Sequence, residues 1–196
     1  MHQALLDLIV ARRSAVALGA PGPTDADIAR LLEAAGSVPD HGQLRPFRFA
    51  VVSGEGRAAF GNALAKSALE RKPGLTDSML EGMRAKALRS PTSILIVASP
   101  KPGKVEAWEQ LATAACAGYA ILLAADALGI GAVWKSVPFT RGAGLIELLA
   151  LGPNEEVLGW IHLGTATQTA SAARPALDIP AVTTVIDGSV PHAFRP

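Results

Sequence analysis

Residues Val105 to Ser136 read VEAWEQLATAACAGYAILLAADALGIGAVWKS, and this stretch decides the fold. Between Leu111 and Leu128 its only charged residue is Asp126, and small or apolar residues occupy nearly every side of the expected helix. All-round apolarity of this kind is typical of a buried helix, not of one lying on a surface. Gly129 and Gly131 end the helix in a tight turn, and an apolar, β-branched pattern then predicts a buried strand.

Small residues along this helix would let another backbone come close, so we expect a core helix shared with a second subunit. They are Ala114, Ala117, Gly118, Ala124 and Ala125. A membrane span needs a window of about 18 apolar residues, and Ala, Gly, Cys, Thr and Asp interrupt this one. The single cysteine, Cys116, is expected to be a small buried core residue. One cysteine excludes an internal disulfide and a CxxC metal site.

Length and charge limit the class of protein. A chain of 196 residues can bury one full core, so we expect a single domain over residues 1–196. The formal net charge of +1 gives no basic field for nucleic acid. The opening HQALLDLIVARRS is too short and too acidic for a secretory signal. We therefore expect a cytoplasmic protein that binds neither nucleic acid nor membrane.

The remaining elements follow from hydrophobic spacing and turn residues. Helices are expected over residues 3–13, 57–71, 79–88 and 140–149, and Thr24 caps a further helix that continues to Ala35. Strands are expected over residues 47–53, 93–98 and 157–164, with another from residue 130. Residues 15–24 must run extended, and the tail from residue 165 has no usable periodicity and is a candidate arm around a partner. The pattern predicts an α/β sandwich around four or five strands.

The common catalytic motifs are absent. The chain has no GxGxxG after a strand, no P-loop, no HExxH and no GxSxG. The segment GIGAVW precedes a strand instead of following one, which is the wrong context for a phosphate-binding glycine loop. Dinucleotide folds, kinases, zinc proteases and serine hydrolases therefore have no support.

Three polar clusters remain, and each has a functional interpretation and a purely structural alternative. Arg12-Arg13-Ser14 offers guanidinium groups and a hydroxyl to a phosphate monoester, or its arginines only meet the negative end of a helix. The segment from Asp40 to Arg45 is dense in donors and acceptors, or is an ordinary polar turn. Trp134-Lys135-Ser136 ends a strand at a solvent edge, or holds a core aromatic and a solvated lysine.

In this order and spacing the clusters resemble the FMN-dependent nitroreductase family, in its small NAD(P)H nitroreductase branch. The family has an Arg-Arg-Ser signature after its first helix, and its Ala-Pro-Ser-x-x-x-Gln-Pro-Trp signature resembles VPDHGQLRPF here. Its long buried helix ending in Gly-x-Gly before a strand resembles ALGIGAVWKS. A strand ending Leu-Gly-Thr resembles Leu163 to Thr165. The resemblance covers nearly the whole chain.

The resemblance implies an α+β fold with a mostly antiparallel sheet, flanking helices, and a C-terminal arm exchanged in an obligate homodimer. It implies FMN at the subunit interface, bound by Arg12, Arg13, Ser14, Pro39, Asp40, His41, Trp134, Lys135 and Ser136. NAD(P)H would reduce FMN and leave, and a nitroaromatic, a quinone or a similar small electron acceptor would then enter by a ping-pong mechanism. Backbone N–H at the strand end would face flavin N5, so no side chain is named as catalytic and no metal is expected.

The sequence departs from the family pattern at Val16, Arg45 and Phe47, which bears on contacts to the flavin ring and not on the phosphate site. Arg174 is a candidate for the basic residue that many members place on the phosphate. Two other functions stay open. One is a non-catalytic flavin-binding redox sensor or carrier. The other is a specialised member such as a dehalogenase or flavin-cleaving enzyme, although the sequence contains no extra lid segment that would favour it.

Overall fold

A computed structural model of the chain describes residues 2–169, 174–188 and 190–194. Its centre is a five-stranded sheet in which every pair of neighbouring strands is antiparallel. The strands follow the order β1-β5-β3-β2, and β4 pairs with β5. Their bounds are β1 Ala15–Gly19, β2 Phe47–Ser53, β3 Thr92–Ala98, β4 Gly131–Lys135 and β5 Glu156–Thr169. The expected α+β fold class is confirmed.

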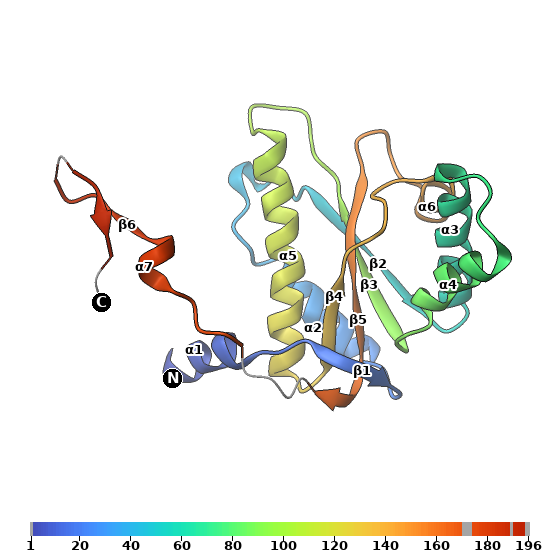
Figure 1. Cartoon of the computed structure of the whole chain (residues 1–196), viewed down its shortest axis with the longest axis horizontal. Coiled ribbons are helices and arrows are strands. Elements are labelled where there is room, and N and C mark those ends of the chain that lie inside the picture. The colour runs from blue at the N-terminus through green and yellow to red at the C-terminus, as the bar shows by residue number, and fades with distance from the viewer. Residues whose placement is uncertain (1, 170–173, 189, 195–196) are drawn as a thin grey trace.

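Helices cover both faces of the sheet (Figure 1). One face carries α2 (Asp25–Ala35) and α5 (Ala107–Ala127), and the other carries α3 (Gly56–Arg71), α4 (Asp77–Ala87) and α6 (Ala143–Leu149). Helix α1 (His2–Ala11) lies beside the start of a C-terminal arm that runs away from the sheet (Figure 1). The described part of the arm holds α7 (Ile179–Val182) and a small hairpin of β6 (Thr184–Val185) and β7 (His192–Ala193).

Strand β3 is the centre of the core because all seven of its residues are buried. Side chains of a strand alternate between the faces of the sheet. Ile94 and Ile96 accordingly pack with α2 and α5, whereas Leu95 and Val97 pack with α3, α4 and α6. The unbroken apolar run in the sequence therefore reflects a strand covered on both faces.

Within one chain α5 is buried on one side only, so packing all round would need a second subunit. Its inward face packs on the sheet, while Trp108, Cys116 and Tyr119 are exposed. The expectation that Cys116 is buried is therefore wrong within this chain. By length and composition alone α5 could cross a membrane, but packing of its inward face on the sheet is the pattern of a core helix.

The small residues of α5 pack against the sheet of their own chain, and sharing of this helix with a second subunit stays a prediction. Ala114, Ala117, Gly118 and Ala125 are all buried inside the chain, and Ala124 packs against the same core. A Cβ atom at Gly118 would overlap the side chains of Trp134 and Ile96. Small side chains at these positions allow α5 to lie close to the sheet.

Several boundaries differ from expectation. Residues 15–24 do run extended, but their first part forms β1, which pairs with Thr165–Thr169 at the end of β5. Strand β5 thus continues beyond residue 164, into the part read as a tail without pattern. Helix α1 ends at Ala11, so Arg12 and Arg13 lie outside it. Thr24 does cap α2, in a reciprocal pair of hydrogen bonds with Asp27.

Candidate cofactor site

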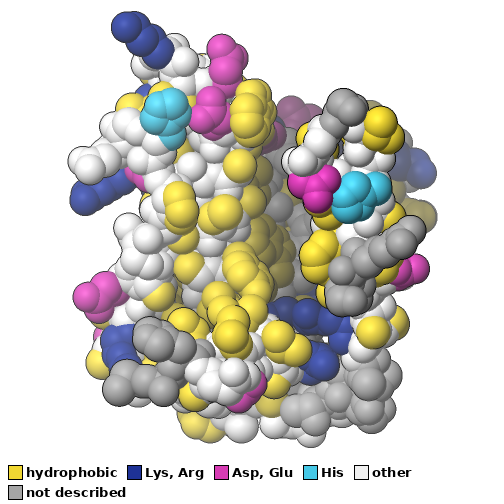
Figure 2. Space-filling model, turned by 90° about the vertical axis from the view of Figure 1, so that its left-hand side faces the viewer, with side chains coloured by type: hydrophobic (Ala, Val, Ile, Leu, Met, Phe, Trp, Pro, Cys, Tyr) yellow, Lys and Arg dark blue, Asp and Glu magenta, His cyan; other side chains and the backbone are white. Residues whose placement is uncertain are grey.

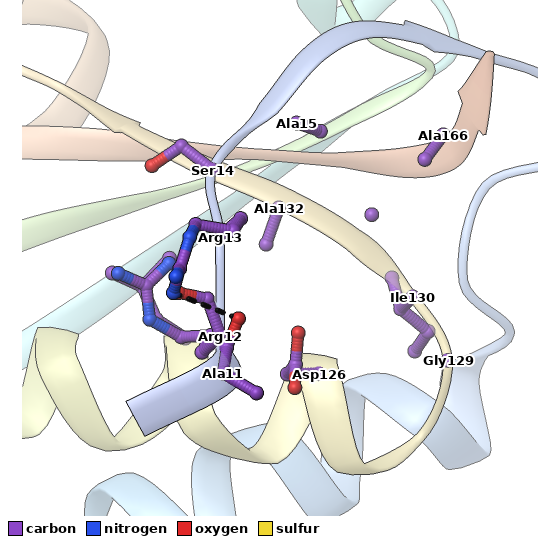
Figure 3. Close-up of a pocket in the computed structure, with 12 residues that line it drawn as sticks. Ala11, Arg12, Arg13, Ser14, Ala15, Asp126, Gly129, Ile130, Ala132 and Ala166 are labelled. Atoms are coloured by element: carbon purple, nitrogen blue, oxygen red, sulfur yellow. Dashed lines mark hydrogen bonds between the residues drawn. The ribbon is translucent and has the colours of Figure 1, made fainter. Parts of the chain in front are cut away.

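Arg12, Arg13 and Ser14 line a cavity of about 300 Å³ between α1 and β1 (Figure 3). The opposite wall comes from the last turns of α5, the glycine turn and the start of β4. Gly129 has φ of 69°, a left-handed value that glycine adopts without strain, and this turn brings α5 and β4 together. The residues on that wall are Leu122, Asp126, Gly129, Ile130, Gly131 and Ala132.

The side chain of Arg12 is half-buried, and two of its three guanidinium nitrogens lack a partner among the described residues. Its Nε and Nη1 atoms are inaccessible to solvent and make no hydrogen bond within the described residues. Leaving a buried charged donor unpaired is costly, of the order of several kcal/mol. Such a group beside a cavity is a candidate partner for an anion, and a phosphate with several oxygens suits the fork of N–H donors.

Arg13 is engaged differently. Its Nη1 atom donates to the carbonyl oxygens of Val10, Ala11 and Arg12 at 2.7, 2.9 and 3.0 Å. The first two are carbonyls of the last turn of α1, which have no partner inside the helix, and the third directly follows that helix. The helix-end alternative is therefore correct for this nitrogen of Arg13, and binding of a cofactor by its remaining nitrogens stays a prediction.

A third arginine reaches the same place from the arm. Arg174 Nη2 donates to the carbonyl oxygen of Arg12 at 3.3 Å. Three guanidinium groups thus gather at the end of α1, with one carboxylate, Asp126, in the cavity wall. In the sequence Asp126 is the only charged residue between Leu111 and Leu128, but no role is predicted for it there. The balance of charge around the cavity favours an anion.

The second cluster forms a tight turn fixed by Asp40. Its carboxylate accepts hydrogen bonds from the backbone N–H groups of Leu44 at 3.2 Å and Arg45 at 2.7 Å. Gly42, Gln43 and Arg45 have φ values of 76°, 53° and 46°, which are strained for the last two because neither is glycine. The polar-turn alternative describes Asp40 correctly, and it does not exclude a second role.

His41 points to α5 instead of the nearby backbone. Its Nδ1 atom lies 2.9 Å from Oε2 of Glu109, in the first turn of that helix. The neighbouring Pro39 is also tied to α5, because its carbonyl oxygen accepts from Thr113 Oγ1 at 3.3 Å. Glu109 was missed at the level of sequence, since nothing in the spacing links residues so far apart in the chain.

The third cluster lies at the end of β4, which among the described strands pairs with β5 alone. Lys135 and Ser136 are exposed there, as expected. The indole of Trp134 is half-buried and packs with the α5 side of the core, so the core alternative is correct for that side chain.

The structure brings the first and third clusters to one edge of the sheet. Gly131 and Ala132 of β4 line the cavity that holds Arg12. A strand advances about 3.3 Å per residue, which places Ser136 roughly 13 Å further along the same edge. A ligand with a phosphate at one end and a ring at the other could follow β4 from cavity to strand end.

The second cluster lies elsewhere in the same chain. Its turn leads into β2, at the opposite edge of the sheet, three strand spacings of about 4.8 Å from β4. Along α5, Glu109 beside His41 and Asp126 in the cavity are separated by about 26 Å, at the rise of an α-helix. One chain therefore does not present all three clusters to one ligand. No group of three metal-ligating side chains occurs within the described ranges.

An antiparallel sheet covered on both faces, with an arginine-lined cavity at its edge, defines an α+β protein with a candidate anion site. The family model described as "Nitroreductase family" matches residues 9–165. The Escherichia coli (strain K12) protein named "Putative NAD(P)H nitroreductase YdjA" is 34% identical over 169 residues, or 86% of this chain and 91% of that protein. The chain belongs to the nitroreductase family, which confirms the resemblance seen in its motifs.

Solved structures show the same fold. A nitroreductase-like family protein from Bacillus cereus superposes with a TM-score of 0.80 at 21% identity, covering 94% of this chain and 96% of that one. The structure of a nitroreductase with bound FMN from Bacteroides fragilis NCTC 9343 gives a TM-score of 0.69 at 23% identity, covering 93% and 98%. At these identities the likeness concerns the fold.

Proposed function

We propose that the chain is an FMN-dependent oxidoreductase that uses NAD(P)H to reduce nitroaromatics, quinones or similar electron-poor acceptors by a ping-pong mechanism. The observation that carries this proposal is that two guanidinium nitrogens of Arg12, beside the cavity, are buried without a partner among the described residues. The name of the Escherichia coli relative and the FMN in the Bacteroides fragilis structure support the choice of donor and cofactor.

In this proposal Arg12, Arg13 and Ser14 hold the phosphate, and the ring lies along β4 toward Trp134, Lys135 and Ser136. FMN, when bound, supplies the centre that accepts and donates hydride. The protein would contribute positive charge and backbone N–H donors at the end of β4. No side chain has to act as nucleophile.

A homodimer completes the proposed site. Because Pro39, Asp40 and His41 lie far from the Arg12 cavity of their own chain, they would reach the cofactor bound by a second copy. Large apolar side chains are exposed along the outward face of α5 and on the arm, and Figure 2 shows both surfaces facing the same side of the molecule. Burying them against a second copy would remove that apolar area from water. They include Trp108, Tyr119, Leu177, Val182 and Ile186.

The whole chain, residues 1–196, is proposed to act as one domain, in the cytoplasm where NAD(P)H is at hand. The test is to purify the protein, record the absorption band of oxidised flavin, and follow NADH and NADPH oxidation with a nitroaromatic and with a quinone. A colourless protein that cannot be loaded with FMN would contradict the cofactor. A yellow protein without turnover would favour a flavin sensor or carrier.

A further inference from the structure

The pair formed by His41 and Glu109 has the geometry of a proton-transfer dyad. The imidazole Nδ1 lies 2.9 Å from a carboxylate oxygen of Glu109. The histidine side chain is 70% exposed, against 33% for the glutamate. One end of the ring is thus held by the protein, while most of its surface is open to a bound molecule.

The carboxylate decides which nitrogen carries a transferable proton. Glu109 stands in the first turn of α5, where the positive end of the helix stabilises a carboxylate. An ionised carboxylate can only accept, so Nδ1 of His41 must donate to it. A second proton on the ring then sits on Nε2, which makes no hydrogen bond to any described residue. Nε2 is the atom that can give a proton to a ligand.

Hydrogen bonds hold the turn that carries His41 in place. Pro39 is bonded to Thr113 of α5, and the Asp40 carboxylate closes the turn through the backbone of Leu44 and Arg45. Left-handed backbone at two non-glycine residues, Gln43 and Arg45, is maintained by these contacts. A general acid has to be positioned in this way relative to the atom it protonates.

We propose that His41 is a catalytic residue that donates a proton from Nε2 to the oxygen of the electron acceptor, and that Glu109 is its positioning residue. The proposal rests on the proposed function, since the acceptor would be bound beside the cofactor of the second copy. Reduction of a quinone to a hydroquinone takes one hydride and one proton. The hydride comes from the bound cofactor, the proton from the His41 imidazolium, and water then returns a proton to Nε2.

Measuring reduction of the flavin and reduction of the acceptor separately distinguishes a proton-donating role of His41 from a structural one. Reduction of the flavin by NAD(P)H needs no proton donor toward an acceptor, and ferricyanide takes up electrons without protons. His41→Gln retains a hydrogen bond donor to Glu109 but cannot protonate an acceptor. We expect it to bind FMN and reduce ferricyanide as the wild type does, while quinone reduction falls about 100-fold, the range typical of a lost general acid.

A second readout does not depend on turnover. In the protein without cofactor, nitrogen-15 NMR of histidine should show His41 with its proton on Nδ1. Glu109→Ala should return the ring to the mixed tautomers of an exposed imidazole and slow quinone reduction by about tenfold, less than His41→Gln. His192→Gln is the matched control, because His192 is also exposed and pairs with a carboxylate, Asp187, at 3.1 Å. It should change neither rate.

Three outcomes in the variant would overturn the role of His41. Equal rates of quinone reduction in wild type and His41→Gln show that it gives no proton. Equal losses with quinone and ferricyanide, or loss of FMN, show that it supports the cofactor or the fold. A wild-type protein that binds FMN but passes no electrons from NAD(P)H to ferricyanide would instead contradict the proposed function itself, and this role with it.

Discussion

Gly118, at the middle of α5, leaves the space that the indole of Trp134 fills. A side chain at this position would overlap both Trp134 and Ile96. Because Trp134 belongs to β4, the contact sets the distance between the helix and the strand that runs from the cavity to the proposed ring position. The absence of a side chain at one residue thus places the edge of the candidate site.

Gly118→Val should therefore lower the free energy of unfolding by about 1–3 kcal/mol, the usual range for overpacking. Urea unfolding measures the loss. Gly82→Val is the matched control, since Gly82 is also inside a helix and a Cβ there meets nothing within 4 Å. Equal stability of the two variants would mean that Trp134 moves aside without cost.

Acid should destabilise the protein through His162, which is buried in the sheet. Trp160 Nε1 donates to its Nε2 at 2.8 Å, so the neutral ring carries its proton on Nδ1, next to Ser90 Oγ at 2.7 Å. Burial, helped by the positive charges of Lys135 and Arg89, lowers the pKa of His162 from 6.5 to about 4. A second proton on the ring, at Nε2, would set that N–H against the N–H of Trp160, leaving two donors without an acceptor between them.

The lowered pKa of His162 determines whether stability rises or falls with pH. Between pH 6.5 and 4 the unfolded chain binds a proton at residue 162 that the folded chain refuses, so stability falls as pH falls. The full loss is about 3 kcal/mol. Urea unfolding at several pH values should show this slope in the wild type and in His192→Gln. His162→Gln should be less stable at pH 7 but lack the slope, and an unchanged slope would assign it to other groups.

A second acid-sensitive contact operates at lower pH. Arg48 donates to both carboxylate oxygens of Glu155, at 2.8 and 2.7 Å, and this pairing lowers the pKa of Glu155 from 4.5 to about 2. Stability from this pair is present above pH 4.5 and is lost as pH falls toward 2. Glu155→Gln should be less stable than wild type at pH 6, with the difference shrinking below pH 4. A constant difference would show that charge is not what the pair contributes.

Most of the fold was predictable because burial leaves a pattern in the sequence. The apolar run of β3 and the long apolar stretch of α5 gave their positions within a few residues. Strand β1 was missed because its pairing with the end of β5 is non-local, and register between distant segments leaves no local signal. The outward face of α5, exposed within one chain, could not be told from the inward face because Ala, Cys and Tyr look the same in sequence whether they face a core or solvent.

The candidate site was predictable as a set of segments but not as an arrangement. Arg12 and Arg13 are adjacent identical residues, and only the end of α1 at Ala11 decides that one caps the helix while the other enters the cavity. The contact between His41 and Glu109 joins a turn to a helix far along the chain. Family motifs name the segments, whereas side-chain partners depend on how helices and strands pack.

Assembly into a dimer is tested on the outward face of α5. Tyr119→Arg places a charge where the proposed second copy would bury apolar surface, which should give a monomer in sedimentation and reduce FMN content. An obligate interface of this kind is expected to exceed roughly 2,000 Å². Leu69→Arg on α3 is the matched control, because Leu69 and Tyr119 are both 43% exposed. A Tyr119→Arg dimer, or a monomer that retains all its FMN, would contradict the shared site.

Arg12→Ala is the most direct test of the phosphate site. A hydrogen bond to a charged group contributes about 1.5–3 kcal/mol, so FMN affinity should fall roughly 10- to 150-fold while riboflavin affinity stays the same. Since two buried nitrogens of this guanidinium have no partner in the part of the chain that the structure describes, its removal should leave the stability of the cofactor-free protein unchanged or higher. Titration of FMN and of riboflavin, with thermal unfolding, measures both effects.

The neighbouring arginine supplies the contrast. Arg13→Ala should lower stability by about 0.3–1 kcal/mol, because it removes the donor that meets the last carbonyls of α1. Arg30→Ala, at an exposed arginine of α2 outside the cavity, should change neither FMN affinity nor stability appreciably. If Arg12→Ala binds FMN as tightly as wild type, no phosphate contacts that guanidinium, and the cofactor must lie elsewhere. If it loses riboflavin equally, Arg12 contacts the rest of the flavin and not its phosphate.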